Sequence, residues 1–297
     1  MLESTLAAII IFLVSSSGAA FNALAMLTVL RSPHLMNAFG ALCFSHTIAN
    51  FGTLLVFIVW VFPATLWQFD NTATLFGRIL GQLQMLFWNA CCYSHLAISF
   101  NRVISIAMPT KAPQLFAFRP TALVIGFIWT IAIAHITPYF WYTTCFAAYS
   151  PETWTWMWGN TLCGYVITIY TDYYTSVAIF AMMSSVDLIT LTLLIAYHKR
   201  AASSSTASKS HRKMEIRFFM QSSLQGLIFF YEVFNFYYVT TLHTNRWFIF
   251  FTSTFAWMLC HCLDGLVVVI FHFRRRTIRR ESKIASVATI TIKSRIE

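Results

Sequence analysis

The sequence predicts an all-α membrane protein: a bundle of seven transmembrane helices, with its N-terminus outside the cell and its C-terminus in the cytoplasm. Three observations lead to this fold class. Hydrophobic residues make up 58% of the chain and charged residues only 10%, against roughly a quarter in a soluble domain. Seven apolar stretches are long enough to cross about 30 Å of hydrocarbon as helices. Lysine and arginine gather on alternate connections, which orients the chain.

The seven stretches follow one another along the chain with little charge inside them. They are too long for the strands of a membrane barrel, and they lack the alternating period of such strands. Acidic residues fall within the last three stretches only, at Asp172, Asp187, Glu232 and Asp264. The predicted spans are residues 5–30, 37–62, 75–101, 120–142, 165–197, 218–240 and 247–273, in a membrane domain of residues 1–275 that precedes a basic tail at 276–297.

The placement of the cations predicts the orientation. Of the 20 lysines and arginines, all but Arg78 and Arg246 lie on the side reached after the first, third, fifth and seventh stretches. The positive-inside rule makes that side cytoplasmic. The net charge of +10 therefore indicates a lipid surface rather than nucleic acid. No cleavable leader pattern is evident, so we expect the first span to act as its own insertion signal.

Two of the seven cysteines bracket a tryptophan-rich outer loop. Cys145 and Cys163 lie on the oxidising side, and the other five lie within spans, where a thiol is usually a small buried hydrophobe. A disulfide is the favoured interpretation, and two free loop thiols are the alternative. The bridge would close a loop of about 19 residues and contribute roughly 3 kcal/mol.

Polar residues inside the spans predict an interior cluster. His46 and Asn50 are four residues apart and share a helix face, as do His261 and Asp264 at a spacing of three. Asn22 lies midway along the first span. The favoured interpretation is structural hydrogen bonding between helices, and the alternative is a hydrated switch that rearranges on activation.

Other residues are candidates for a ligand pocket. Glu232 lies mid-span and Asp172 near the outer part of the fifth span, although for Asp172 we favour solvation among the lipid headgroups. Trp154, Trp156 and Trp158 alternate, which suggests an extended ribbon with its indoles on one side. Those indoles either cover a pocket or anchor the loop in the interface.

Several other functions are disfavoured by the residues. All six lysines are predicted to be cytoplasmic, which excludes a retinal Schiff base within the bundle. The histidines are scattered over several spans and both edges, so we predict no metal site, and there is no glycine-rich phosphate loop. A ligand-gated channel or a transporter remains the alternative, but it would need a continuous polar stripe or inverted repeats.

Several positions resemble motifs of G-protein-coupled receptors. Asn101-Arg102 stands where that superfamily has Asp/Glu-Arg-Tyr, Ala49-Asn50 resembles its Ala-Asp pair on helix two, and Trp129 resembles its lone tryptophan on helix four. Four longer blocks are more specific: "CYSHLAISFNRVISIAMPTK", "SPETWTWMWGNTLC", "EIRFFMQSSLQG" and "TFAWMLCHCLDGLVVVIF". They resemble blocks of the nematode serpentine receptors of class x, and this closer resemblance covers about residues 10–275.

This resemblance implies a chemosensory receptor rather than an enzyme, with no cofactor. Its partners would be the lipid bilayer, a heterotrimeric G protein and a small molecule such as an odorant or pheromone, bound in the outer half of the bundle. Its location would be the plasma membrane of sensory neurons, in their cilia. The G-protein face would contain Arg102, the second inner loop and the base of helix six, including Arg217.

The chain departs from the superfamily pattern at several positions. Asn101 is neutral, so no acid beside Arg102 can form the usual ion pair within the helix, and we expect Glu215 near the start of helix six to replace it. The outer end of helix three has Gly77 and Arg78 instead of a cysteine, which favours the pairing of the two loop cysteines with each other. Helices five and six lack their common prolines, and helix seven lacks the Pro and Tyr of its motif.

Overall fold

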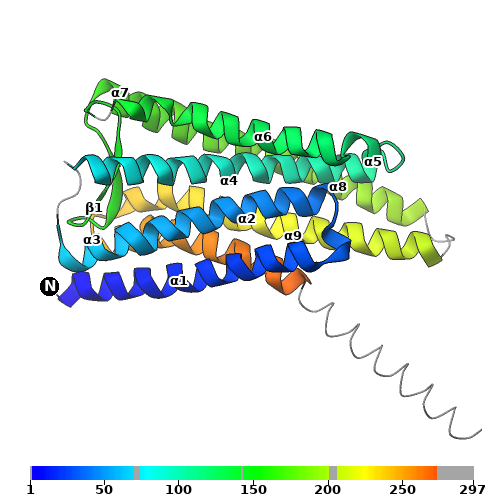
Figure 1. Cartoon of the computed structure of the whole chain (residues 1–297), viewed down its shortest axis with the longest axis horizontal. Coiled ribbons are helices and arrows are strands. Elements are labelled where there is room, and N and C mark those ends of the chain that lie inside the picture. Colours follow the sequence, from blue (N-terminus) through cyan, green and yellow to red (C-terminus); the bar gives the residue numbers. More distant parts are fainter. Residues whose placement is uncertain (1, 70–73, 142, 201–205, 273–297) are drawn as a thin grey trace, which may run out of the picture.

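The computed structural model describes residues 2–69, 74–141, 143–200 and 206–272, so the basic tail at 276–297 lies outside the described residues. Within these residues seven long helical segments lie side by side in one elongated bundle (Figure 1). The predicted class, an all-α bundle of seven helices, is confirmed. In five of the segments the helix is long and apolar enough to cross a membrane, and α4 and α9 complete the set.

The first two segments are longer than the sequence predicted. α1 covers Leu2–Arg31, and the 3-10 turn η1 (Pro33–Leu35) leads into the second segment. That segment consists of α2 (Ala38–Val56), the π-helical η2 (Phe57–Val61) and α3 (Phe62–Trp67) without a break.

The second segment continues through Pro63, where the sequence predicted its end. A proline inside a helix removes one backbone donor and its ring crowds the preceding turn. The wide turn of η2 provides the space, because the N–H of Phe62 bonds to the carbonyl of Phe57 five residues back.

The third and fourth segments also differ from their predicted limits. α4 covers Leu75–Ala107, so Arg102 does not lie at the helix end but is followed by more than one further turn. A short α5 (Ala112–Leu115) precedes α6 (Phe118–His135), which ends before the predicted residue 142 and continues as the 3-10 turn η3 (Thr137–Phe140).

The fifth and sixth segments also differ from their predicted limits. The fifth consists of α7 (Leu162–Val166), the π-helical η4 (Ile167–Tyr173) and α8 (Tyr174–Arg200). The sixth, α9, covers Thr206–Tyr237 and therefore begins twelve residues before the predicted residue 218. Glu215 lies inside this helix, not near its start.

The seventh segment is broken near its beginning. After the 3-10 turn η5 (Val239–Leu242), α10 covers Arg246–Thr252, and Ser253 interrupts the helix with φ −116° and ψ −89°. The Ser253 hydroxyl donates to the carbonyl of Ile249 at 2.5 Å, which partners a carbonyl near the helix end. A last helix then runs over residues 254–272.

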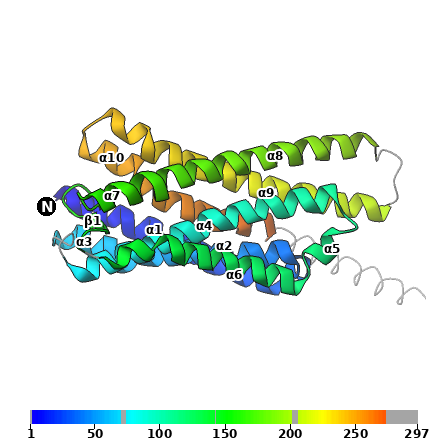
Figure 2. The same cartoon turned by 90° about the horizontal axis from the view of Figure 1, so that it is seen from above.

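A β-hairpin covers one end of the bundle. β1 (Ala147–Ser150) pairs antiparallel with β2 (Thr155–Trp158), with Ala147 opposite Trp158. Every residue of β1 is buried, and α4 approaches it so closely that a Cβ on Gly81 would collide with the carbonyl oxygen of Ala147. Figures 1 and 2 show the hairpin, the start of α1 and α10 at one end, here called the hairpin end, and α5 at the opposite end, the α5 end.

Candidate functional site

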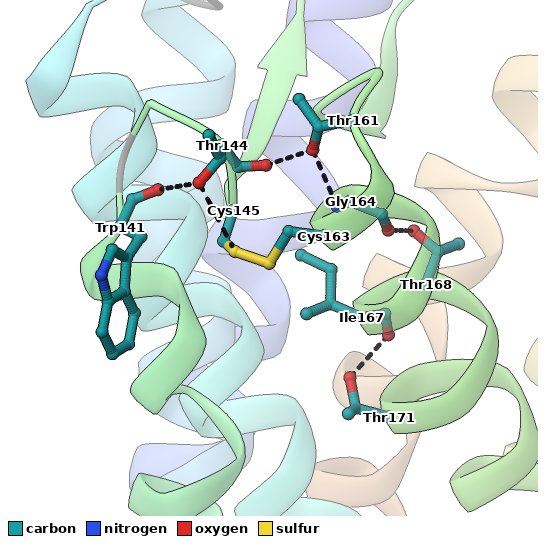
Figure 3. Close-up of a disulfide and its surroundings, with 9 residues drawn as sticks. All are labelled: Trp141, Thr144, Cys145, Thr161, Cys163, Gly164, Ile167, Thr168 and Thr171. Carbon is teal, nitrogen blue, oxygen red and sulfur yellow. Dashed lines mark hydrogen bonds between the residues drawn. A yellow bond between two sulfur atoms is a disulfide. The ribbon is translucent and has the colours of Figure 1, made fainter.

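A disulfide fixes the hairpin to the fifth segment (Figure 3). Cys145 and Cys163 are bonded, with their Cα atoms 5.3 Å apart, which is within the usual range. Thr161 caps α7 by accepting from the N–H of Gly164 at 2.9 Å, and its hydroxyl donates to the carbonyl of Thr144. The residues on both sides of the disulfide are therefore held by hydrogen bonds as well as by the bridge.

Arg246 anchors the tip of the hairpin. Its guanidinium lies 3.5 Å from the ring centre of Trp154, and its Nη2 donates to the carbonyl of Pro151 at 3.0 Å. Trp154 has φ 59°, a left-handed conformation that residues with a side chain seldom adopt. Thr254 adds a third contact by donating to the carbonyl of Trp154 at 2.6 Å. The sequence predicted only that Arg246 lies on the outer side of the membrane. It did not predict these contacts, because Pro151 and Trp154 are more than 90 residues away along the chain.

The three alternating indoles of the outer loop face the bundle. Trp154 and Trp156 are 0% and 5% exposed, and Trp158 is half-buried. Trp156 packs edge to face against Phe57 and Trp257, with ring centres 6.3 and 5.9 Å apart. An interfacial belt would leave these rings exposed to lipid, whereas their burial makes the hairpin a lid packed into the end of the bundle.

Beneath the hairpin, two carboxyl groups share a small aromatic pocket. Asp172 and Glu232 are 5% and 2% exposed, so the expectation that Asp172 is solvated among headgroups is wrong. The physical reason is that the hairpin covers this end of the bundle and Tyr237 of α9 donates to Asp172 at 2.7 Å, which the depth of the residue along its span does not indicate. The pocket is partly open, has a volume of about 10 Å³ and is lined by Trp88, Trp158, Asp172, Glu232, Phe236, Tyr237 and Trp257.

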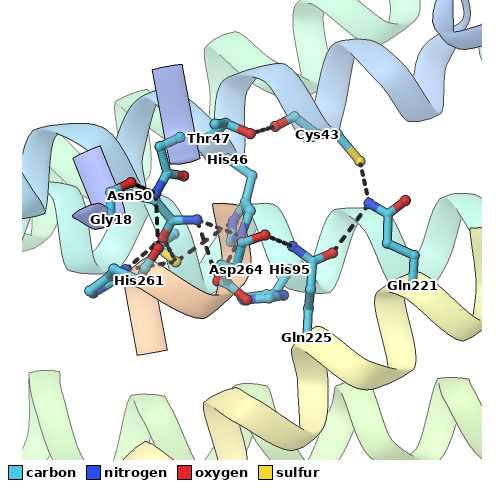
Figure 4. A network of polar contacts seen from close by, with 12 residues as sticks. Gly18, Cys43, His46, Thr47, Asn50, His95, Gln221, Gln225, His261 and Asp264 are labelled. Atoms are coloured by element: carbon cyan, nitrogen blue, oxygen red, sulfur yellow. Dashed lines mark hydrogen bonds and ion pairs between the residues drawn. The ribbon is translucent and has the colours of Figure 1, made fainter. Parts of the chain in front are cut away.

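The middle of the bundle holds a buried polar cluster (Figure 4). Asp264, on the last helix, is at its centre. Its Oδ2 lies 3.0 Å from His46 Nε2 and 3.3 Å from His95 Nε2. Asn50 Nδ2 lies 3.0 Å from the same His46 nitrogen and 3.4 Å from Asp264 Oδ2. All four residues are at most 3% exposed, so their polar atoms depend on one another.

The cluster extends to α1 through Asn50 and His261. His261 Nδ1 lies 2.6 Å from Asn50 Oδ1, which also accepts from the Cys91 thiol at 3.3 Å. Asn22 Nδ2 donates to the carbonyls of His261 and Gly18, both at 2.9 Å. The structure thus brings together Asn22, His46, Asn50, His261 and Asp264, the five residues that the sequence analysis grouped.

A second part of the cluster was not predicted. Gln225 on α9 donates to the carbonyl of Asp264 at 3.5 Å, and Gln221 donates to Gln225 at the same distance. Gln221 Oε1 lies 2.7 Å from His272 Nε2 at the end of the last helix. The four-residue spacing of the two glutamines was an available signal, because it places both amides on one helix face.

Four residues of the cluster could serve as metal ligands. One donor atom from each of His46, Cys91, His95 and Asp264 lies within 4.8 Å of the others. Imidazole, thiolate and carboxylate donors suit a cation such as Zn²⁺. His46 Nε2 can either donate to Asp264 or accept from Asn50, because a single ring nitrogen cannot do both. The sequence analysis predicted no metal site, and this absence stays a prediction beside the candidate ligand group.

At the α5 end, Arg102 of α4 is buried and paired with α9. Its Nη1 donates to Glu215 Oε2 at 2.8 Å, and its Nη2 donates to Asn101 Oδ1. The guanidinium lies over the rings of Phe39 and Phe218, 4.3 and 5.1 Å from their centres. Ion pairing and aromatic contact together offset the cost of burying the charge.

The ion pair lies in the wall of a pocket at the α5 end. This pocket measures about 220 Å³, and its lining comes from α2, α4, α5 and α9. Asn101, Arg102 and Glu215 all line it. Arg217, the fourth residue predicted for this region, is half-buried two positions further along α9.

Comparison with known proteins agrees with this arrangement. The family described as "Serpentine type 7TM GPCR chemoreceptor Srx" matches residues 12–272. The chain belongs to the Srx family. As an Srx protein it is a seven-transmembrane chemoreceptor of the G-protein-coupled receptor class, and the family resemblance found in the sequence is confirmed.

Individual relatives span most of this Srx chain. It is similar to "Serpentine receptor class X 45" of Caenorhabditis elegans, with 25% identity over 93% of this chain and 81% of the relative. It is also similar to "Serpentine receptor class X-43" of the same organism, with 24% identity over 66% of this chain and 63% of the relative. Among solved structures, squid rhodopsin has the same fold, with a TM-score of 0.75, 13% identity, and coverage of 93% of this chain and 84% of rhodopsin.

Proposed function

We propose that this Srx receptor binds a small extracellular molecule beneath the hairpin and activates a heterotrimeric G protein at the α5 end. The observation that carries the proposal is the buried ion pair between Arg102 and Glu215, which joins α4 to α9 beside a pocket of about 220 Å³. Such a pair holds the two helices together until a partner offers the arginine an alternative contact. The arrangement of the cations supports the topology, with the hairpin end outside the cell and the α5 end in the cytoplasm.

Two helices connect the proposed ligand pocket to the proposed G-protein face. α4 contributes Trp88 to the aromatic pocket, His95 to the polar cluster and Arg102 to the ion pair, at intervals of seven residues. Seven residues make about two helical turns, so the three side chains share one face.

α9 repeats this arrangement in the opposite chain direction. It contributes Glu232 to the aromatic pocket, Gln225 to the polar cluster and Glu215 to the ion pair. A shift of α9 relative to α4 therefore changes all three regions together. This is a mechanism for signalling from one end of the bundle to the other, with the polar cluster as the element that has two arrangements.

Basal signalling tests the restraint without any ligand. Glu215→Gln removes the acid of the ion pair at nearly constant volume, so we expect G-protein turnover to rise several-fold without ligand. The measurement is nucleotide exchange on a co-expressed G protein, normalised to the amount of receptor at the cell surface. Glu3→Gln is the matched control, because Glu3 is exposed at the start of α1, at the hairpin end.

Two results would contradict the proposal. Basal turnover that stays at the wild-type level at equal surface density would mean that the ion pair restrains nothing. An ionic current that appears in the same cells without nucleotide exchange would favour the channel alternative.

A further inference from the structure

The aromatic pocket beneath the hairpin contains two buried acids, and no described residue lining it supplies a positive charge to balance them. Among the described residues that line it there is no lysine, arginine or histidine, although Asp172 and Glu232 are both buried there. None of the ion pairs among the described residues involves either acid. A buried carboxylate is costly unless a cation or a proton neutralises it.

The two acids differ in how well they are satisfied. Asp172 accepts from the hydroxyl of Tyr237 at 2.7 Å and from the indole of Trp88. Glu232 Oε2 is buried and has no hydrogen-bond partner among the described residues. Asp172 is therefore already held by the protein, whereas Glu232 has an acceptor available for a donor from outside the chain.

The walls of the pocket suit a positive charge. Trp88 and Trp257 meet edge to face with ring centres 5.5 Å apart, and Phe236 lies 6.0 Å from Trp257 and 6.1 Å from Trp158. Aromatic faces attract cations, tryptophan most strongly, and the attraction grows when water is excluded. Two acids inside a ring of indole and phenyl groups form a site for an organic cation.

The size of the pocket narrows the class of cation. Its volume of about 10 Å³ is about that of one water-sized probe. A primary ammonium group is close to this size and carries three N–H donors, whereas a trimethylammonium group is much larger and carries none. We propose that the pocket binds the ammonium group of a small primary amine, with Glu232 as its principal acceptor.

The proposal rests on the proposed receptor function and adds the chemical class of the ligand. Asp172, held by Tyr237 and Trp88, supplies the second negative charge. The carbon skeleton of the amine enters past Trp158, because this partly exposed indole is the one lining residue that the hairpin contributes.

Matched sets of compounds test the class. Each set contains a primary amine, the alcohol with the same skeleton and the trimethylammonium derivative, for example 2-phenylethylamine, 2-phenylethanol and its trimethylammonium analogue. We expect at least one amine of a panel of alkyl- and arylamines to raise the Tm of the purified full-length receptor and to evoke G-protein turnover in cells. The matching alcohols and trimethylammonium compounds should do neither.

A variant then links the response to Glu232. Glu232→Gln keeps the shape but removes the charge, so the half-maximal concentration of the active amine should rise about tenfold to a hundredfold. Glu152→Gln is the control at the same end, because Glu152 is exposed in the hairpin turn. If Glu232→Gln fails to reach the surface, Asp172→Asn replaces it, and the comparison of amine with alcohol on the wild type needs no variant.

The outcomes separate this inference from the proposed function. An alcohol or trimethylammonium compound as potent as its amine, or an unchanged response in Glu232→Gln, overturns the amine assignment. A panel in which no amine changes the Tm also overturns it, since protons rather than a bound cation then neutralise the carboxyls. Basal turnover in Glu215→Gln needs no ligand, so it tests the receptor function independently.

Discussion

Buried acids lie near both ends of the bundle, but their partners differ. At the α5 end, Glu215 meets Arg102 at 2.8 Å, so the chain supplies both charges of the pair. At the hairpin end, Asp172 and Glu232 share a pocket whose described lining contains no basic residue. The first region is complete within the chain and can only be opened. The second is incomplete and can be completed by a molecule from outside.

This difference gives the two ends different expected roles. Opening the ion pair needs a partner that stabilises the freed arginine, as a G-protein surface would. Completing the acid pocket needs a cation, as an amine would supply. The polar cluster between them contains a residue from each of the two helices that connect the ends, His95 from α4 and Gln225 from α9.

The largest effect is expected at the complete end. Arg102→Met keeps an unbranched side chain but leaves Glu215 buried without its cation, which costs about 3–5 kcal/mol for a buried pair. We expect a lower Tm in detergent and loss of G-protein turnover, in contrast to the increase expected for Glu215→Gln. Normal turnover in Arg102→Met at normal surface density would remove the functional distinction between the two ends.

The next effect concerns the lid at the incomplete end. Cys145→Ser with Cys163→Ser removes the disulfide that holds the hairpin, with an expected loss of roughly 3 kcal/mol. We expect a lower surface level and a weaker ligand response, but basal turnover per surface receptor should stay unchanged because the ion pair is remote. A non-reducing gel should show the change in mobility. A rise in basal turnover would show that the hairpin also restrains the α5 end.

The smallest effect is expected from the cluster that connects the ends. Asp264→Asn keeps the size of the side chain and removes the charge facing His46 and His95. We expect the coupling energy between ligand binding and G-protein turnover to fall by about 0.5–2 kcal/mol, which reduces the ligand-evoked turnover. The measurement compares amine binding with evoked turnover in the same preparation. Unchanged coupling would contradict the switch hypothesis and favour the interpretation of the cluster as structural hydrogen bonding between helices.

The lid illustrates what a local pattern can predict. The alternation of Trp154, Trp156 and Trp158 is typical of an extended ribbon, in which residues two apart point to one face. β2 (Thr155–Trp158) contains Trp156 and Trp158, whereas Trp154 precedes it with φ 59°. Whether the indoles faced lipid or protein depended on packing against rings that are distant in the sequence, such as Phe57 and Trp257 against Trp156, and a local pattern does not indicate these contacts.

Helix limits illustrate where local patterns are insufficient. Hydrophobicity marks the part of a helix that lies in lipid, so the polar first turns of α9, from Thr206, were missed and Glu215 was placed near a helix start. The burial of Asp172 was missed because its place near the outer end of the span does not indicate the hairpin that covers it or Tyr237, which donates to it at 2.7 Å. Both corrections changed the environment of a candidate functional residue.

By itself, the sequence determined the membrane class, the number of helices, the family and the polar residues that gather in the interior. Composition and span length decide the class, the number of helices and the cost of interior polar residues, because water and hydrocarbon each tolerate only certain residues. The family followed from the resemblance of four sequence blocks. The sequence suggested Glu215 as the partner of Arg102, but the tertiary structure alone decided that Asp172 and Glu232 share a pocket with no basic residue in its described lining. Arg102 and Glu215 are 113 positions apart, and Asp172 and Glu232 come from different helices, so only the packing of the helices brings them together and determines that one acid meets a cation while the others do not.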